Sequence, residues 1–251
     1  MITHLYIVTG SSRGVGEALV AELLHPDHLV LGLARHQNEQ LQTLAATRGA
    51  PLTQWAVDLA EPVLPAQRLA EWLERQDPGA LASATLINNA GVVSTPAPLG
   101  EAPLAELSNA IRVGLEAALL LSASFLHATD AWPGERKVLN ISSGMGRRAM
   151  AGSASYCAAK AGMDHFSRAV AMEQEVRPNP AKVVSMAPGV IDTDMQRQLR
   201  GADAALFPER ELFARLHDDG QLMSPTACAR ALLAKLARAD FGTEPIADIR
   251  D

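Results

Sequence analysis

The sequence predicts an α/β fold, a single doubly wound domain in which a parallel sheet is covered by helices on both faces. Short buried apolar runs alternate regularly with amphipathic segments along the 251 residues, and this alternation is typical of parallel strands joined by crossover helices. A glycine-rich turn directly follows the first apolar run, as in domains that bind nucleotides at a helix N-terminus. No linker interrupts the pattern, so we expect one domain over residues 1–251.

The N-terminal half contains four strands, each followed by a helix. His4–Thr9 is a short apolar run closed by Gly10, which predicts a buried strand, and the amphipathic segment Glu17–Leu24 predicts the helix that follows. Apolar runs and helical periodicity then predict, in order, strand Leu29–Leu33, helix Gln37–Thr47, strand Thr53–Val57, helix Pro65–Arg75, strand Thr85–Ile87 and the long helix Leu104–Ala128.

The C-terminal half continues the alternation and then loses it. The predicted elements are strand Lys137–Ile141, the long helix Ser153–Glu175, strand Lys182–Met186, helix Pro225–Arg238 and a candidate last strand at Pro245–Ile249. Residues 193–221 are looser and only partly helical. We expect this least patterned stretch, about residues 192–223, to cover the substrate.

Composition argues against several classes of function. The net charge of -6, with no cluster of basic residues, argues against a nucleic-acid partner. Cys157 and Cys228 do not make a disulfide framework, so a reduced cytoplasmic protein is the simplest interpretation. We expect neither a signal peptide nor a membrane span, because no charged N-terminal region precedes a long apolar run and we find no stretch that approaches the ~20 apolar residues of a span.

Tyr156 and Lys160 form the pair that points most directly to chemistry. Residues four apart share a helix face, so the lysine ammonium should lie beside the phenol and lower its pKa from the ordinary value near ~10. The phenol can then give a proton to a carbonyl oxygen or take one from an alcohol. Ser143 follows the apolar run that ends at Ile141, so its hydroxyl should lie at a strand end and bond the same substrate oxygen.

Chance alone does not easily produce this pair. The chain has two Tyr and four Lys in 251 residues, and uniform placement gives roughly 0.03 such pairs. Gly10, Gly14 and Gly16 strengthen the case, because they lie between the first strand and first helix, where glycine lets the backbone approach a phosphate and the helix N-terminus attracts it. Their spacing is G-x-x-x-G-x-G rather than the standard G-x-G-x-x-G.

The end of the second strand indicates which dinucleotide is bound. Ala34-Arg35 stands where an acidic residue would bind the ribose 2′-hydroxyl of NAD. Arg35, with Arg13 in the glycine turn, suits a 2′-phosphate, so we infer NADP(H). The alternative is that both arginines are solvated surface residues. Asp58 could bind the adenine amino group or cap the following helix.

Taken in order and spacing, the motifs resemble the short-chain dehydrogenase/reductase family over nearly the whole chain. The resemblance rests on Thr9-Gly10-x-x-x-Gly14-x-Gly16, Asn88-Asn89-Ala90-Gly91, Ser143, Tyr156-x-x-x-Lys160, and Pro188-Gly189 followed by Thr193. Within the family, YCAAKA at residues 156–161, APGVIDTDMQ at 187–196 and the tail from 240 to 251 are similar to sepiapterin reductases and bacterial benzil reductases.

The resemblance implies a Rossmann-like sheet of about seven parallel strands and hydride transfer from NADPH to a carbonyl. Tyr156 would be the acid, Lys160 would lower its pKa and hold the nicotinamide ribose, and Ser143 would orient the carbonyl. The implied cofactor-binding residues are Gly10, Ser12, Arg13, Gly14, Val15, Gly16, Arg35, Asp58, Leu59, Asn89, Ala90, Gly91, Tyr156, Lys160, Pro188, Gly189, Ile191 and Thr193. The implied substrate-binding residues are Ser143, Tyr156 and Asp248.

Two positions leave alternatives open. Asp248 matches the Asp that anchors the pterin in sepiapterin reductases, but a solvated terminal residue is the alternative. Gly114, within Val113-Gly114-Leu115, replaces the usual Asn that helps hold a water in the proton relay to the lysine. Glycine retains the main-chain carbonyl, so we expect a weakened relay and tolerance of Gly114→Asn. A glycine inside a helix also costs about 1 kcal/mol relative to Ala, and the helix could bend there.

The sequence therefore predicts an NADPH-dependent carbonyl reductase acting on a small dicarbonyl or a pterin side-chain ketone. The alternatives are an alcohol dehydrogenase that works oxidatively and a non-catalytic NADP-binding regulator. We expect no metal, because we assign His25 and His28, which flank Pro26 in a loop, no further ligands. We interpret Arg147 and Arg148 as a solvated turn, with a place on the pocket wall as the alternative. Surplus Ala and Leu on the two long helices predict a homodimer or homotetramer.

Overall fold

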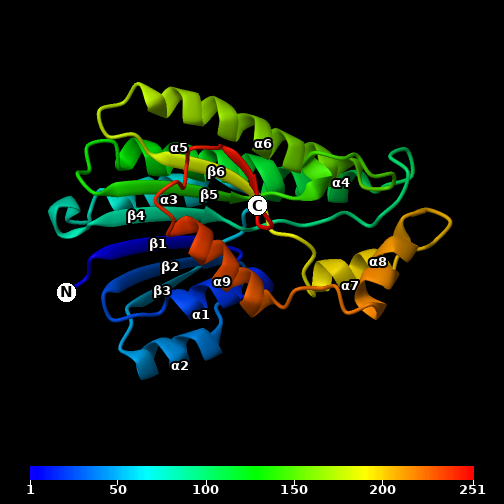
Figure 1. The fold of residues 1–251 in the computed structure, drawn as a ribbon, viewed down its shortest axis with the longest axis horizontal. Helices are drawn as coiled ribbons and strands as arrows, with labels where there is room; N and C mark the ends of the chain where they lie inside the picture. Colours follow the sequence, from blue (N-terminus) through cyan, green and yellow to red (C-terminus); the bar gives the residue numbers. More distant parts are fainter.

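A seven-stranded parallel sheet forms the centre of the computed structural model, which describes all 251 residues. The strands are β1 (His4–Thr9), β2 (His28–Ala34), β3 (Leu52–Ala56), β4 (Ser83–Asn88), β5 (Glu135–Ile141), β6 (Lys182–Ala187) and β7 (Ile246–Asp248). Their order is β3-β2-β1-β4-β5-β6-β7, with every neighbouring pair parallel (Figure 1). The order reverses between β1 and β4, which opens a crevice at the carboxyl ends of these strands. The predicted doubly wound sheet is confirmed.

Helices cover both faces of this sheet, as the alternation of the sequence predicts. They are α1 (Gly14–Leu23), α2 (Glu39–Arg48), α3 (Val63–Leu73), α4 (Leu104–Ile111), α5 (Ala117–Ala128), α6 (Ala154–Glu175), α7 (Asp194–Arg200), α8 (Arg210–Asp218) and α9 (Pro225–Leu236). Side chains of α1, α2 and α9 share one buried cluster with the sheet, and those of α3 and α5 share the other. Along β1, Leu5 and Ile7 enter one cluster and Val8 the other, because successive strand residues point to opposite faces.

The predicted helix Leu104–Ala128 is interrupted at its middle. Residues Arg112–Glu116 form a π-helical segment between α4 and α5, and the Ala117 N–H bonds the Arg112 carbonyl five residues back. Such single-turn bulges are rare and occur mostly at functional sites. Gly114 lies buried inside the segment, so the predicted irregularity is a widened turn of the helix.

The same helix corrects the expectation about membrane spans. Leu104–Ala128 is 25 residues long, and the mean hydropathy of its most apolar window is 1.4, enough to cross a membrane by length and composition alone. This is weak evidence, because the core helices of globular proteins pass the same test. Here 39% of its most apolar window is buried inside the protein, and Leu121 and Phe125 pack against the sheet.

The loosely patterned region after β6 contains two short helices. Figure 1 shows α7 and α8 together beyond the carboxyl end of the sheet. Leu199, Phe207 and Phe213 form a small apolar cluster of their own with Met150. An isolated bridge pairs Ile191 with Met223, so the two ends of this region lie side by side.

Candidate active site

One large cavity, about 910 Å³, opens at the carboxyl ends of the strands. It contains all of the predicted catalytic and substrate residues and all but one of the predicted cofactor residues. Gly16 is the exception, since it does not line the cavity. A Cβ at Gly16 would lie 2.1 Å from the Gly10 carbonyl oxygen and 2.6 Å from Nδ2 of Asn89, so this glycine lets α1 pack closely against the turn.

The glycine turn suits the close approach of an anion. Gly10 and Gly14 have φ angles of 67° and 58°, a left-handed conformation that other residues rarely adopt. Arg13 precedes α1 in an extended conformation, and no side chain caps the helix. The first N–H groups of α1 therefore remain available, and together with the helix dipole they favour a phosphate.

Thr9 connects the glycine turn to the end of β4. Its Oγ1 accepts hydrogen bonds from the backbone N–H groups of Asn89 and Ala90, each at 2.9 Å. The Asn89 side chain donates in return to the Thr9 carbonyl at 2.9 Å. These bonds hold the predicted Asn89-Ala90-Gly91 segment at the crevice, where a Cβ at Gly91 would lie 3.6 Å from the Lys160 Nζ.

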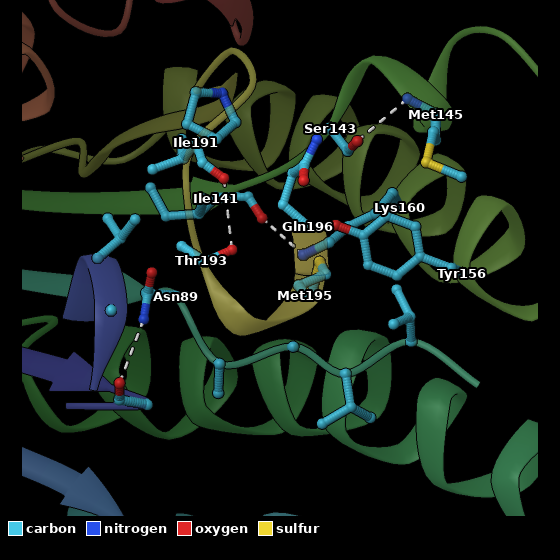
Figure 2. A pocket seen from close by; sticks show the side chains of 18 of the residues that line it. Asn89, Ile141, Ser143, Met145, Tyr156, Lys160, Ile191, Thr193, Met195 and Gln196 are labelled. Carbon is cyan, nitrogen blue, oxygen red and sulfur yellow. Dashed lines mark hydrogen bonds between the residues drawn. The ribbon is translucent and has the colours of Figure 1, made fainter. Parts of the chain in front are cut away.

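Ser143, Tyr156 and Lys160 meet on one wall of the cavity, as predicted (Figure 2). Ser143 lies just past the end of β5, where its Oγ accepts a hydrogen bond of 3.1 Å from the Met145 N–H. Tyr156 lies in the first turn of α6 and Lys160 one turn later, and both are buried, with 8% and 2% of their surface exposed. The Lys160 Nζ is 5.7 Å from the centre of the Tyr156 ring.

The expected lowering of the tyrosine pKa is wrong for this arrangement. Burial raises the pKa of Tyr156 to about 12, although a hydrogen bond with Ser143 works in the other direction. Burial also lowers the pKa of Lys160 to about 8, opposed by the nearby Asp164. The physical reason is burial of the phenol, which the Lys160 ammonium does not offset while it donates to the Ile141 carbonyl at 2.6 Å.

A buried network behind Lys160 was missed by sequence reasoning. Asp164 accepts a hydrogen bond from Ser185 at 2.7 Å and one from the Arg147 Nε at 3.2 Å. Arg147 also donates to the Ala247 carbonyl at 2.7 Å, so it joins the Ser143 loop to β7 rather than forming a solvated turn. The signal was present in the sequence, because Asp164 follows Lys160 by one helical turn. Arg148 lines the cavity.

The predicted nucleotide end of the cavity is charged and open. Arg35 is exposed there, and Arg13 pairs with Asp194 at 3.1 Å, with 64% and 54% of the two side chains exposed. Such an exposed pair is weakly held and leaves Arg13 able to turn toward an anion. Asp58 does not cap the following helix, because the N-cap residue of α3 is Pro62. Its carboxylate accepts the Ala60 N–H at 2.9 Å in the turn before the helix, and Asp58 lines the cavity.

Asp248 lies at the cavity wall rather than in solvent. It is the last residue of β7, its side chain is only 14% exposed, and both of its carboxylate oxygens accept hydrogen bonds of 2.7 Å from Arg250. The Arg250 guanidinium holds the pKa of Asp248 below its usual range, with a smaller contribution from Arg147. The carboxylate is therefore ionised and already bonded.

Gly114 fits a tight contact between the π-helical segment and α6. A Cβ at this position would lie 3.2 Å from the Cβ of Ala159, which is fully buried. That separation is shorter than an ordinary van der Waals contact, so a larger residue has to push α6 away. The expected tolerance of Gly114→Asn therefore conflicts with the packing.

Three potential metal ligands come together far from the cavity. His25 and His28 are joined by Asp27, a partner that sequence reasoning overlooked, and their ligand atoms lie within 4.8 Å of one another. The group is largely satisfied without an ion, because His25 bonds Asp27 and the His28 Nδ1 bonds the Leu23 carbonyl at 2.8 Å.

The fold and site are similar to known oxidoreductases. The model of the short chain dehydrogenase family matches residues 4–204. The chain is 32% identical over 235 residues to a benzil reductase, (S)-benzoin forming, of Bacillus cereus, covering 94% of each chain. It is 35% identical over 241 residues to that of Bacillus subtilis (strain 168), covering 96% and 95%, and 33% identical over 256 residues to the sepiapterin reductase of Rattus norvegicus, covering 98% and 95%.

Solved structures of oxidoreductases are also similar to this chain. A short-chain dehydrogenase/reductase from Burkholderia vietnamiensis is 35% identical, with a TM-score of 0.65 and coverage of 99% of this chain and 97% of that one. The KRED1-Pglu enzyme is 27% identical, with a TM-score of 0.80 and coverage of 96% and 98%. A putative NAD(P)-dependent gluconate 5-dehydrogenase from Beutenbergia cavernae, with bound NADP at low occupancy, is 25% identical, with a TM-score of 0.80 and coverage of 99% and 96%.

Proposed function

The chain belongs to the short-chain dehydrogenase family of oxidoreductases, and from this premise we propose that it is an NADPH-dependent reductase of small carbonyl compounds. The observation that supports the proposal most directly is that Ser143 and Tyr156 lie on a wall of the same cavity that the glycine turn lines. Benzil, which names one group of relatives, has two adjacent ketones, and sepiapterin, which names the other, has a side-chain ketone beside a hydroxyl-bearing carbon. We therefore propose a ketone with a neighbouring oxygen function, a small dicarbonyl or a pterin side-chain ketone, as the substrate class.

The cavity residues fit a nicotinamide dinucleotide. The free N–H groups of α1 and the left-handed Gly10 and Gly14 would hold the pyrophosphate, and Pro188 and Gly189 at the end of β6 would lie beside the nicotinamide. Arg13 and Arg35 would hold a 2′-phosphate, and no acidic residue stands at the end of β2 to bind a free 2′-hydroxyl. When bound, the cofactor supplies the hydride that goes to the carbonyl carbon.

Tyr156 and Ser143 then act on the carbonyl oxygen. The Ser143 hydroxyl donates a hydrogen bond that orients this oxygen and stabilises its developing charge. The Tyr156 phenol gives its proton to the same oxygen, which completes the alcohol. A pKa near 12 keeps the phenol protonated at neutral pH, so Tyr156 is poised to act as an acid. Lys160, with a pKa of about 8, is able to return a proton to the phenolate near neutral pH.

The proposed preference for NADPH favours reduction over alcohol oxidation, because the cellular NADPH pool is a reductant. The same tyrosine would act as the base in the opposite direction. A non-catalytic NADP-binding regulator has no need for a serine, a buried tyrosine and a buried lysine gathered at one cavity wall. Gly114 alone supports the regulator.

We also propose that the protein is cytoplasmic. The two cysteines of the protein are free, and NADPH is a cytosolic reductant. Exposed apolar side chains on α5 and α6, including Leu119, Met172 and Val176, support a homodimer or homotetramer.

A carbonyl panel tests the function. The purified protein is mixed with NADPH or NADH and with benzil, sepiapterin and simple ketones, and the loss of absorbance of the reduced cofactor is followed. We expect turnover of at least one dicarbonyl, with NADPH preferred. Absence of turnover with every carbonyl, together with tight NADPH binding, would favour the regulator. Turnover only of alcohols with the oxidised cofactor would favour the oxidative enzyme.

A further inference from the structure

A pair of opposite charges at the end of β7 controls which groups the cavity offers to a substrate. Asp248 and Arg250 both line the cavity. The Nε and NH2 groups of Arg250 donate to the two carboxylate oxygens of Asp248, each at 2.7 Å. The Arg250 side chain is 75% exposed whereas that of Asp248 is 14% exposed, so the guanidinium covers a partly buried carboxylate from the solvent side. Arg250 thus occupies an acceptor position on each carboxylate oxygen of Asp248.

Asp248 lies near the reacting end of the cavity. Arg147, four residues after Ser143, donates to the carbonyl of Ala247, which holds β7 next to the Ser143 loop. The other two carboxylates that line the cavity are engaged elsewhere, Asp58 with the Ala60 N–H and Asp194 with Arg13. Asp248 is therefore the carboxylate best placed to meet a substrate.

Apolar side chains form much of the remaining wall: Met145, Met150, Met195, Leu199, Leu212, Phe213 and Leu216. Gln196 and Gln198 also line the cavity, and the Gln196 amide already donates to the Phe213 carbonyl and accepts from Arg200. Methionine adapts to irregular shapes and makes favourable contacts with aromatic rings. Such a wall suits the phenyl rings of benzil, which carry no N–H donor. The pterin ring of sepiapterin carries amino and ring N–H donors, and burying them without an acceptor is costly.

We propose that Arg250 is a specificity-determining residue, which by occupying Asp248 favours apolar aromatic dicarbonyls over ring systems rich in N–H donors. The inference rests on the proposed carbonyl reductase function. Overall identity does not separate the two substrates, because benzil and sepiapterin reductases match the chain about equally, at 32% and 33%. The Asp248–Arg250 pair is a local feature that would separate the two substrates.

Asp248 should keep its orientation when the Arg250 side chain is removed. The backbone N–H of Arg250 also donates to Oδ1 of Asp248 at 3.1 Å, so loss of the side chain leaves the carboxylate oriented and frees Oδ2. Arg147 continues to favour the ionised carboxylate after that change, because it also lowers the pKa of Asp248. Arg250→Ala should therefore create an acceptor at the cavity wall.

The test compares two substrates across matched variants of the full chain with NADPH. Arg250→Ala should raise kcat/KM for sepiapterin about tenfold, mainly through KM, because a charge-assisted hydrogen bond is gained. The value for benzil should change by less than about twofold. Arg238→Ala is the control, since Arg238 bonds Asp240 in the same two-pronged way, at 2.8 and 2.6 Å, but outside the cavity. It should change neither substrate.

The double variant Arg250→Ala with Asp248→Asn should lose the gain for sepiapterin. An equal gain for both substrates would mean only a wider cavity, and a gain that survives in the double variant would not involve the carboxylate; either result overturns the proposal, as does no gain at all. Calorimetric binding of sepiapterin to the NADP-loaded variants tests the pair without turnover. If the unmodified protein reduces no carbonyl, the proposed function fails, whereas tighter binding to Arg250→Ala still supports the role of Arg250.

Discussion

In the proposed reduction, Tyr156 is the group whose loss should matter most. Tyr156→Phe removes the proton donor and keeps the ring that packs in the cavity wall, so kcat should fall about 10²- to 10⁴-fold. NADPH affinity, measured by fluorescence titration, should remain nearly unchanged, because the phenol hydroxyl contributes little to binding. Retained turnover would mean that another group supplies the proton.

The buried Lys160 sets the pH range in which reduction is fast. Its pKa is lowered to about 8 by burial, so the ammonium is present below this pH and lost above it. Only the ammonium has a proton to return to the Tyr156 phenolate, so kcat should be level below about pH 8 and decline above it. Steady-state kinetics from pH 6 to 10 with saturating NADPH measure the profile. An increase of kcat across pH 8 would contradict the role of Lys160 as proton source.

Cofactor preference depends on the exposed Arg35. Arg35→Ala should weaken NADPH binding about tenfold, the effect of losing one charge-assisted hydrogen bond, and leave NADH binding unchanged because NADH has no 2′-phosphate. Isothermal titration with both cofactors measures the two constants. Arg75→Ala is a suitable control, since Arg75 is an exposed arginine that does not line the cavity. Equal affinity of the unmodified protein for NADPH and NADH would refute this assignment.

At the level of helices and strands, periodicity was enough to locate the elements, because parallel strands buried on both faces are apolar throughout and the helices between them are not. The ends shifted by a few residues. Gly114 predicted an irregularity in the long helix, but the π-helical form of Arg112–Glu116 has no pattern of its own in the sequence. The Tyr156 pKa depends on burial, and the Lys160 ammonium bonds the Ile141 carbonyl of β5; neither can be predicted from a spacing of four residues.

Within the site, the contacts of the charged side chains could not be predicted from the sequence either. The glycines, Ser143, Tyr156 and Lys160 were found because they form short motifs. Arg250 covers Asp248 only two residues away, yet nothing in the sequence says that the two side chains turn toward each other. The contact of Arg147 with Ala247 joins residues a hundred positions apart. Such features depend on tertiary packing.

The packing of the π-helical segment against α6 should make Gly114→Asn harmful rather than neutral. The new side chain meets Ala159, whose neighbour Lys160 belongs to the site, so overpacking should destabilise the protein by about 1–3 kcal/mol. The melting temperature should fall by several degrees, as expected for a chain of this size, and kcat should fall with it. Thermal unfolding and kinetics of Gly114→Asn, with Gly100→Asn as a control at an open position, measure both effects. An unchanged melting temperature would show that α6 yields without cost.

At the level of the whole molecule, we propose that the exposed apolar side chains of α4, α5 and α6 pack against a partner. Leu104, Leu119 and Met172 are 82%, 44% and 68% exposed on these helices. The three side chains lie on neighbouring helices rather than at scattered surface positions, and such exposed apolar patches mark interaction sites. A hollow between α4 and α6 is lined by Leu107, Ile111 and Ala158 among others. A second copy of the chain, related by a two-fold axis, would cover such a surface with the same surface.

Light scattering should therefore give a mass of two or four times the 26.6 kDa of one chain. Ala158→Arg places a charge in the hollow between α4 and α6 without entering the core, because Ala158 is exposed, so it should shift the protein toward the monomer. Leu64→Arg on α3 is the matched control, since Leu64 is 74% exposed on a helix outside this surface. Dissociation by Leu64→Arg would place the interface on α3, and a monomeric unmodified protein would remove the need for any partner.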